Sequence, residues 1–281
     1  MTISEMRREY HRVVCSEILG VGPSGPNIAD IGSRASVAIA RELVAILGYP
    51  VCPAPPKIQT IGGIFERRTL EFLQRTFELL QHLRPGTWAY SVHGRISDFD
   101  QYHYLAALKT AASKYPELAK LLGRDYLIIP DIVIARQPVP DSEINRQAPL
   151  LEGDSDVASL TPLRRRNHPQ PQPILHATVS CKWTLRSDRA QQIRMEGINL
   201  IRMRKGRTPH IVAVAAEPLP SRIASLALGT GDLDCVYHFA LPELQAAVQR
   251  TNNEDQAAVL TELVELRRLR DISDLPFDLA I

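Results

Sequence analysis

The alternation of apolar strand patterns with helical patterns between residues 174 and 239 constrains the fold most. The apolar run ILHATVSCKW is followed by a helical pattern from Ser187 to about Met203, and then by the apolar run HIVAVAAE. A short helical pattern after Pro220 and the apolar run DCVYHFA complete the series. Strands that alternate with helices are typical of sheets with parallel members and flanking helices. We therefore predict an α/β fold with a central mixed β-sheet flanked by helices.

The regions on both sides of this alternation are predominantly helical or irregular. We predict one domain, made of an N-terminal helical part (about 1–85), an α/β core (about 86–240) and C-terminal helices (241–281). Proline-rich residues 52–60 and 136–172 are expected to be irregular, and the loop 20–33 is rich in Gly and Pro. The remaining expected elements are helices over 3–19, 36–47, 63–83, 101–113 and 116–122, strands over 87–93 and 125–135, and two helices after 241.

Cysteine spacing and hydropathy argue against a zinc protein and against a membrane protein. The cysteines at positions 15, 52, 181 and 235 form no CxxC pair, so we expect reduced thiols, most of them buried. The chain contains no run of 18 apolar residues, and its first residues carry charges where a signal peptide would be apolar. These features predict a cytoplasmic protein.

Positive charge is concentrated in one stretch, although the net charge is only +2. Eleven Lys and Arg residues and two acids lie between Arg164 and His210, whereas eight acids and four Arg follow residue 240. Basic stretches of this kind favour phosphate binding, because each neutralised phosphate adds to the affinity for DNA. The alternative interpretation is a solvated helix face.

Two polar side chains interrupt apolar strand patterns. Asp131 follows Pro130 within the run DYLIIPDIVIA, and Lys182 stands near the end of ILHATVSCKW. Each residue alone has a purely structural explanation: Asp131 could be a buried acid with its hydrogen bonds satisfied, and Lys182 a lysine whose amino group reaches solvent. Hydrolysis of phosphodiesters, however, needs carboxylates that hold Mg²⁺ and a cation that positions the attacking water. An Asp and a Lys on two strands, with a further carboxylate nearby, provide these groups.

The residues Pro130-Asp131 and Ser180-Cys181-Lys182 resemble the PD…(D/E)xK signature of nucleases, with two departures. The two parts are 51 residues apart (182 − 131 = 51), and Ser180 occupies the position where an acid is expected. Both departures characterise the NgoMIV branch of type II restriction endonucleases. The stretch SCKWTLRSDRAQQIRMEG resembles that branch, as do LQHLRPGTW, DYLIIPDIV, EPLPSRIASLALGTGDLDCVYHFAL and LRDISDLPFDLA. The resemblance extends over nearly the whole chain, and implies a PD-(D/E)xK nuclease core.

The resemblance implies a role for each catalytic residue. Asp131 is expected to bridge Mg²⁺ ions, two per active site, with the backbone carbonyl of Cys181 as a further ligand. Lys182 is expected to orient the nucleophilic water, and Ser180 marks the branch. The displaced acid corresponds to Glu196, fourteen residues after the lysine (196 − 182 = 14), and Glu66 completes the acidic shell. Both glutamates are expected to act partly through metal-bound water, because Mg²⁺ retains several waters.

Base recognition is predicted at the start of the helix after the catalytic strand. Arg186, Asp188 and Arg189 match a CCGG core in chemical type, because Arg pairs with guanine and Asp accepts from cytosine N4. Ser187 is a candidate N-cap. The resemblance further implies that Arg222 and Asp30 read an outer G·C pair and that Gln59 approaches from the minor groove. Here the chain departs from the branch, because a serine expected two residues after Asp30 is replaced by Gly32.

The resemblance implies a homotetramer that cuts double-stranded DNA at GCCGGC after the first G, leaving a 5′ overhang. A palindromic site itself favours two-fold protein symmetry. The residue pattern leaves open a structure-specific repair nuclease and a non-catalytic DNA-binding protein. A small-molecule α/β enzyme has no support, because the chain lacks a Gly-rich phosphate loop and a GxSxG motif.

Overall fold

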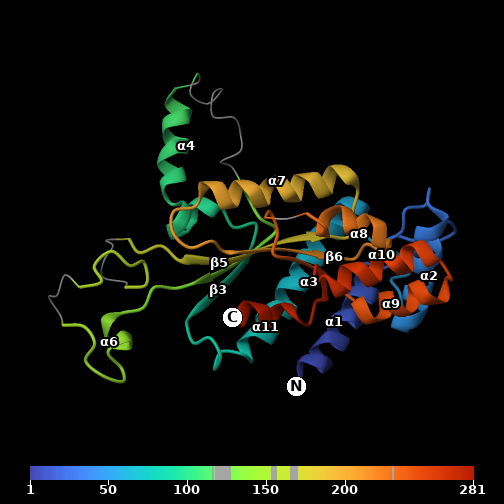
Figure 1. The fold of residues 1–281 in the computed structure, drawn as a ribbon, viewed down its shortest axis with the longest axis horizontal. Helices are drawn as coiled ribbons and strands as arrows, with labels where there is room; N and C mark the ends of the chain where they lie inside the picture. The colour runs from blue at the N-terminus through green and yellow to red at the C-terminus, as the bar shows by residue number, and fades with distance from the viewer. Residues whose placement is uncertain (116, 118–127, 153–156, 165–169, 230) are drawn as a thin grey trace. The chain divides into compact units, whose positions relative to one another are not determined.

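The computed structural model describes all residues except 116, 118–127, 153–156, 165–169 and 230. Six strands are hydrogen-bonded in the order β3-β4-β5-β6-β7-β8 and form a mixed sheet with helices on its flanks (Figure 1). β3 and β4 are antiparallel, whereas β6 and β7, and likewise β7 and β8, are parallel. The predicted α/β fold with a mixed sheet is therefore confirmed.

The chain divides into two compact units, which share strand β5 (Ile174–Lys182) and helix α7 (Ser187–Met203). Unit 1 comprises residues 1–84, 179–198 and 210–281, and unit 2 comprises residues 85–178 and 199–209. The prediction of one domain in three parts stays a prediction.

Unit 1 surrounds three strands, β6 (His210–Ala215), β7 (Cys235–His238) and β8 (Leu269–Asp271), with helices. Within it α1 packs against α3, α2 against α9 and α8 against α10. A two-stranded ribbon, β1 with β2, precedes α2. The bounds are α1 (Ile3–Glu17), β1 (Val21–Gly22), β2 (Gly25–Pro26), α2 (Arg34–Leu47), α3 (Ile58–Glu78), α8 (Pro220–Ala227), α9 (Leu241–Arg250), α10 (Glu254–Glu265) and α11 (Leu275–Ala280).

Unit 2 is built on the antiparallel pair β3 (Trp88–Val92) and β4 (Ile132–Arg136). Its helical elements are two short 3₁₀ turns (Ile96–Asp98 and Asp100–Tyr102), α4 (Tyr104–Lys114) and α6 (Asp141–Ile144). Within this unit the buried Gln101 amide holds the first part of β5, since it donates to the Leu175 carbonyl (2.7 Å) and accepts from the Leu175 N–H (2.9 Å).

The structure corrects several predicted boundaries. α3 begins at Ile58, inside the region predicted to be irregular, because no proline follows Pro56 and the Lys57 carbonyl accepts from Thr60 and Ile61. The same helix ends at Glu78 and not at 83. The C-terminal region contains β8 and α11 in addition to the two predicted helices. The predicted helix 116–122 lies outside the described residues, apart from position 117.

Other predictions about single residues are confirmed or corrected. The four cysteines are free and three of them are buried, as expected. Arg194 belongs to the basic stretch predicted to bind phosphate or to form a solvated helix face, but it forms an ion pair with Asp232 (2.7 Å), so that prediction is wrong for this residue. No helix among the described residues is long and apolar enough to span a membrane.

A buried ion-pair network fastens α1 to the C-terminal part of unit 1. The Arg7 guanidinium donates to both carboxylate oxygens of Glu243 (2.8 and 2.6 Å) and of Asp271 (2.8 and 2.7 Å). Its side chain is only 14% exposed. Burial opposes ionisation of Asp271, but the hydrogen bonds and the charge of Arg7, together with the hydrogen bonds from Ser273, outweigh it and lower the pKa of Asp271.

We expect Arg7→Ala to lower the free energy of unfolding by about 3 kcal/mol, because it leaves two carboxylates buried without their counter-ion. Urea unfolding would measure the loss. Arg12→Ala is the control, since its pair with Glu9 is exposed and is expected to contribute less than about 1 kcal/mol. Equal effects of the two substitutions would contradict the role assigned to burial.

Candidate active site and nucleic-acid interface

In unit 2, Asp131 stands directly before β4 and not within a strand. Pro130 precedes it, and proline cannot donate to a sheet, which explains why the strand begins only at Ile132. The Asp131 carbonyl accepts from the N–H of His93 (3.0 Å), a residue just beyond β3 with a positive φ of 55°. This bond extends the pairing of β3 with β4 by one residue pair and places both side chains at the same edge of the sheet.

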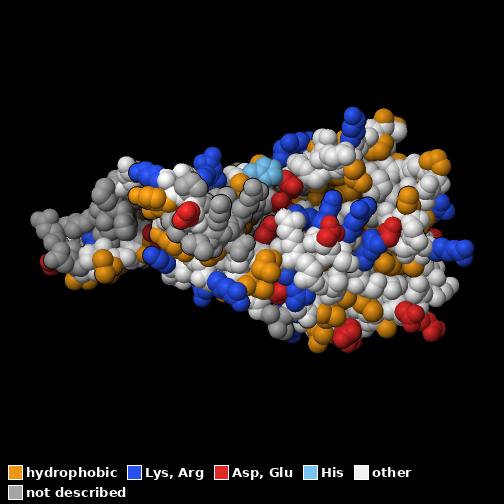
Figure 2. Space-filling model, turned by 90° about the horizontal axis from the view of Figure 1, so that it is seen from above, with side chains coloured by type: hydrophobic (Ala, Val, Ile, Leu, Met, Phe, Trp, Pro, Cys, Tyr) orange, Lys and Arg blue, Asp and Glu red, His pale blue; other side chains and the backbone are white. Residues whose placement is uncertain are grey.

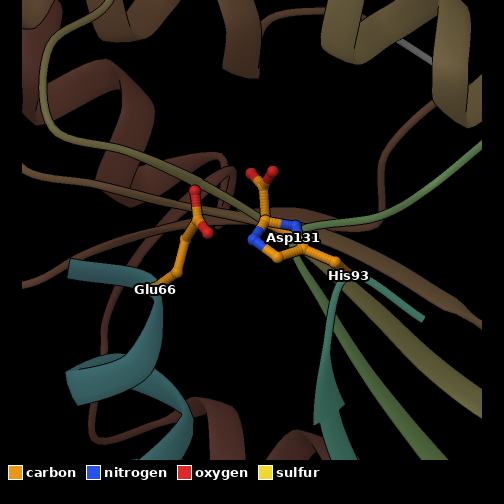
Figure 3. A group of neighbouring side chains, drawn as sticks. All are labelled: Glu66, His93 and Asp131. Carbon is orange, nitrogen blue, oxygen red and sulfur yellow. The ribbon is translucent and has the colours of Figure 1, made fainter. Parts of the chain in front are cut away.

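His93 is a candidate functional residue that the sequence interpretation missed. A nitrogen of its imidazole and an oxygen of the Asp131 carboxylate lie within 4.8 Å of each other, close enough for one metal ion to bind both (Figure 3). A carboxylate beside an imidazole is a donor set that divalent cations accept. The sequence signal was slight, because His93 appeared only as the last residue of a predicted strand.

In unit 1, Glu66 and Lys182 are positioned by neighbouring aromatic residues. Glu66, the third side chain drawn in Figure 3, lies on α3 and is 8% exposed. The preceding residue, Phe65, packs edge-on against Trp183, the residue after Lys182, with ring centroids 5.3 Å apart. Both rings are buried. This contact holds the middle of α3 beside the end of β5, as the predicted site requires.

Lys182 is the last residue of β5, and Ser180 and the buried Cys181 precede it in the same strand. The Lys182 carbonyl accepts from the N–H of Ala216 (3.0 Å), which fixes the strand end against the residue after β6. Glu196 lies on α7, where its carboxylate accepts from Gln192 (3.0 Å).

A glycine beside Glu196 permits the close packing of α7. A Cβ at Gly197 would clash with the carbonyl oxygen of Asp232, so only glycine allows the helix to approach this loop. The Arg194–Asp232 ion pair fastens α7 to the same loop. Together these contacts fix the rotation of α7, and thereby the direction in which Glu196 points.

Three of the six predicted base-reading residues line one pocket of unit 1. The pocket has a volume of about 240 Å³, and Arg186, Asp30 and Arg222 line it together with Ile58 and Thr184. Gln59 follows Ile58 in the first turn of α3 and is exposed. Asp188 and Arg189 are exposed in the first turn of α7.

Asp30 and Arg222, predicted to read the same base pair, form an ion pair with each other. The Gly32 N–H and the Arg222 guanidinium together lower the pKa of Asp30. Ser33, the serine next to Gly32, is the N-cap of α2 and accepts from the Ser36 N–H (3.3 Å). The pocket therefore presents a charged pair, Asp30 and Arg222, whose members lie in direct contact.

The predicted N-cap of α7 is displaced by one residue. The helix begins at Ser187, and the Arg186 carbonyl accepts from the Ala190 N–H (3.0 Å), so Arg186 occupies the cap position. On the face drawn in Figure 2, Lys and Arg side chains lie among Asp and Glu side chains.

Comparison with known proteins shows the family to which this chain belongs. The model of the NgoMIV restriction enzyme family matches residues 10–281. This chain belongs to that family. The Type II restriction enzyme NgoMIV of Neisseria gonorrhoeae is 46% identical over 285 residues, an alignment that covers 99% of this chain and 98% of that protein. The predicted enzyme class, a type II restriction endonuclease, is therefore confirmed.

A solved structure titled Type IIF restriction endonuclease Bse634I with cognate DNA is a more distant match. It is 12% identical and covers 97% of this chain and 91% of its own chain, with a TM-score of 0.30. This likeness is too weak to bear on the site.

Proposed function

We propose that this restriction endonuclease uses Mg²⁺ to cut double-stranded DNA at palindromic sites with a CCGG core. The proposed full site is GCCGGC, cut after the first G to leave a 5′ overhang. The observation that carries the proposal is the pocket lined by Arg186, Asp30 and Arg222. Its groups are those that recognise G·C pairs in the major groove.

Asp131, Glu66, Glu196 and the Cys181 carbonyl are the proposed metal ligands, direct or through water. Oxygen donors of this kind suit Mg²⁺, and the near burial of Glu66, a residue that is 8% exposed, is consistent with a site that binds a cation. Two bound Mg²⁺ ions would supply an activated water and neutralise charge on the scissile phosphate. Lys182 orients the attacking water and stabilises the negative charge that develops on the phosphate oxygens. Ser180 has no separate chemical role in this proposal.

In the proposed recognition, Arg186 and Arg189 each donate two hydrogen bonds to a guanine, and Asp188 accepts from a cytosine amino group. Arg222 and Asp30 read the outer pair, and Gln59 reaches the minor groove. Arg222 and Asp30 pair with each other, so reading the outer G·C pair would require each of them to exchange this partner for a base. A base pair that cannot replace both partners leaves one charge unpaired, which disfavours binding.

We further propose that the enzyme is a cytoplasmic homotetramer in which two dimers each bind one DNA duplex. The palindrome supplies the two-fold symmetry of each dimer. Light scattering at micromolar concentration would give four times the mass of the 31.4 kDa chain.

The proposed function is tested by cutting a plasmid that carries GCCGGC sites, with and without Mg²⁺, and by sequencing the ends. We expect discrete fragments, only with Mg²⁺, that end after the first G. Cutting that follows branched DNA and not a sequence would favour a structure-specific repair nuclease. Specific binding without cutting at any Mg²⁺ concentration would favour a non-catalytic DNA-binding protein.

Arg186→Ala is expected to weaken binding to GCCGGC by about 1–3 kcal/mol and to relax selection at the base pair that Arg186 reads. Competition binding against DNA with single base-pair changes in the CCGG core would measure both effects. Arg202→Ala is the matched control, because Arg202 is exposed near the other end of α7. If Arg186→Ala changed neither affinity nor site choice, the recognition assignment would be wrong.

His93→Ala is expected to raise the Mg²⁺ concentration for half-maximal cleavage by about 10-fold or more, a typical effect of losing a group next to a metal ligand. The reason is the proximity of the imidazole to the Asp131 carboxylate. Titration of the cleavage rate with Mg²⁺ would measure the change. His103→Ala, another exposed histidine of unit 2, is the control. An unchanged titration curve would remove His93 from the metal site.

A further inference from the structure

Glu217, two residues after β6, is a fully buried acid that the proposed recognition and chemistry do not use. Its relative exposure is 0%. Burial raises the pKa of its carboxyl to about 7. A buried acid is costly to retain, so its hydrogen bonds indicate what it contributes.

The two oxygens of the Glu217 carboxylate each accept from a different backbone segment. Oε2 accepts from the N–H of Leu185 (2.8 Å), and Oε1 accepts from the N–H of Leu219 (3.2 Å). Leu185 immediately precedes Arg186, and Leu219 immediately precedes α8, the helix that carries Arg222. One side chain therefore joins the two segments that carry the predicted base-reading arginines.

The Arg222 guanidinium contacts both Leu185 and Glu217. Its Nη1 donates to the carbonyl of Leu185 (3.4 Å) and lies 4.0 Å from Glu217 Oε2. Through Asp30, the same guanidinium is also tied to the loop before α2. Three segments of unit 1 that are far apart in the sequence thus meet at the Glu217 carboxylate and the Arg222 guanidinium.

We propose that Glu217 is a positioning residue for site selection, which holds the segment before Arg186 and the start of α8 at a fixed separation. With this separation fixed, Arg186 and Arg222 meet an inner and an outer base pair of the same DNA site together. The inference rests on the proposed recognition of G·C pairs and adds to it a residue that touches no base.

Glutamine cannot replace Glu217 in this role. A carboxylate offers two acceptor oxygens, whereas an amide of nearly the same size offers one oxygen and one NH₂ group. In Glu217→Gln the NH₂ group would face either the Leu185 N–H or the Leu219 N–H, so one of the two bonds is lost and the facing donors repel each other. At a pH above the pKa of Glu217, where its carboxyl is ionised, the loss of a hydrogen bond to this charged group corresponds to about a tenfold change in an equilibrium constant, or more.

The test compares wild type and Glu217→Gln in single-turnover cleavage and binding of duplexes that contain GCCGGC or ACCGGT. We expect the preference for GCCGGC over ACCGGT to fall about tenfold or more in the variant. Affinity for GCCGGC should fall as well, while the cleavage rate at saturating enzyme should change little, because the catalytic residues are untouched. Circular dichroism would confirm folding. If Glu217→Gln does not fold, Glu217→Asp serves, since its shorter side chain cannot reach both N–H groups.

Glu243→Gln is the matched control, because it removes one charge from the Arg7 network in the same unit. It is expected to lower stability and to leave the preference unchanged. A wild-type preference that persists in a folded Glu217 variant would overturn this inference alone. A wild-type enzyme without preference between the two duplexes would overturn the proposed function and the inference together.

Discussion

Asp131→Asn is expected to lower the single-turnover cleavage rate at GCCGGC by about 10³-fold or more, because a neutral amide binds Mg²⁺ far less well than a carboxylate. Asparagine preserves the size of the side chain. The pairing of β3 with β4 depends on backbone atoms, including the Asp131 carbonyl, and should persist. The variant should therefore fold and bind DNA normally, so that the defect lies in the chemical step.

The measurement uses enzyme in excess over a labelled duplex, with a rapid-quench time course at saturating Mg²⁺. Binding is measured separately, in Ca²⁺, by competition between GCCGGC and unrelated DNA. Asp98→Asn is the control, because Asp98 is an exposed acid of the same unit. A variant of Asp131 that cuts within tenfold of wild type would exclude Asp131 as a metal ligand.

Lys182→Ala is expected to slow cleavage by about 10²–10³-fold, the usual effect of removing one group that stabilises transition-state charge. The lysine lies at the end of β5, and its backbone carbonyl, which bonds to Ala216, is preserved in the variant. Unlike the Asp131 variant, it should keep the Mg²⁺ dependence of the wild type, because Lys182 binds no metal. The two variants are thus distinguished by the Mg²⁺ titration as well as by rate.

Lys182→Arg helps to separate charge from position. It retains the positive charge but not the compact ammonium group that would orient one water, so partial activity is expected. Lys114→Ala, at the exposed end of α4, controls for a general loss of positive charge. If Lys182→Ala weakened binding but left the saturated rate unchanged, Lys182 would be a phosphate contact and not part of the chemistry.

The class of fold and the family of the enzyme were predictable from the amino-acid sequence alone. Alternating strand and helix patterns predicted the mixed sheet, since periodicity reports directly which side of an element is buried. The motif around Lys182 and the blocks along the chain pointed to the family that the comparisons confirm. Element ends were less predictable. β4 begins only at Ile132, two residues after Pro130. α3 begins at Ile58, because no proline follows Pro56.

Which side chains meet could not be predicted from the sequence, because contacts between distant segments depend on packing and not on local patterns. His93 and Asp131 lie 38 residues apart in sequence (131 − 93 = 38), and only the pairing of β3 with β4 brings them together. The ion pair between Asp30 and Arg222 was not foreseen either, although both residues were assigned to the same base pair.

The sequence around Glu217 resembles the sequence around Asp131. Like Asp131, Glu217 is an acid beside a proline at one end of an apolar strand pattern. Sequence alone could not distinguish an acid that binds metal from one that accepts two backbone N–H groups, because both appear as a single carboxylate in an apolar context. The fold separates them: Asp131 stands next to an imidazole at a sheet edge, whereas Glu217 is fully enclosed and bonded to Leu185 and Leu219.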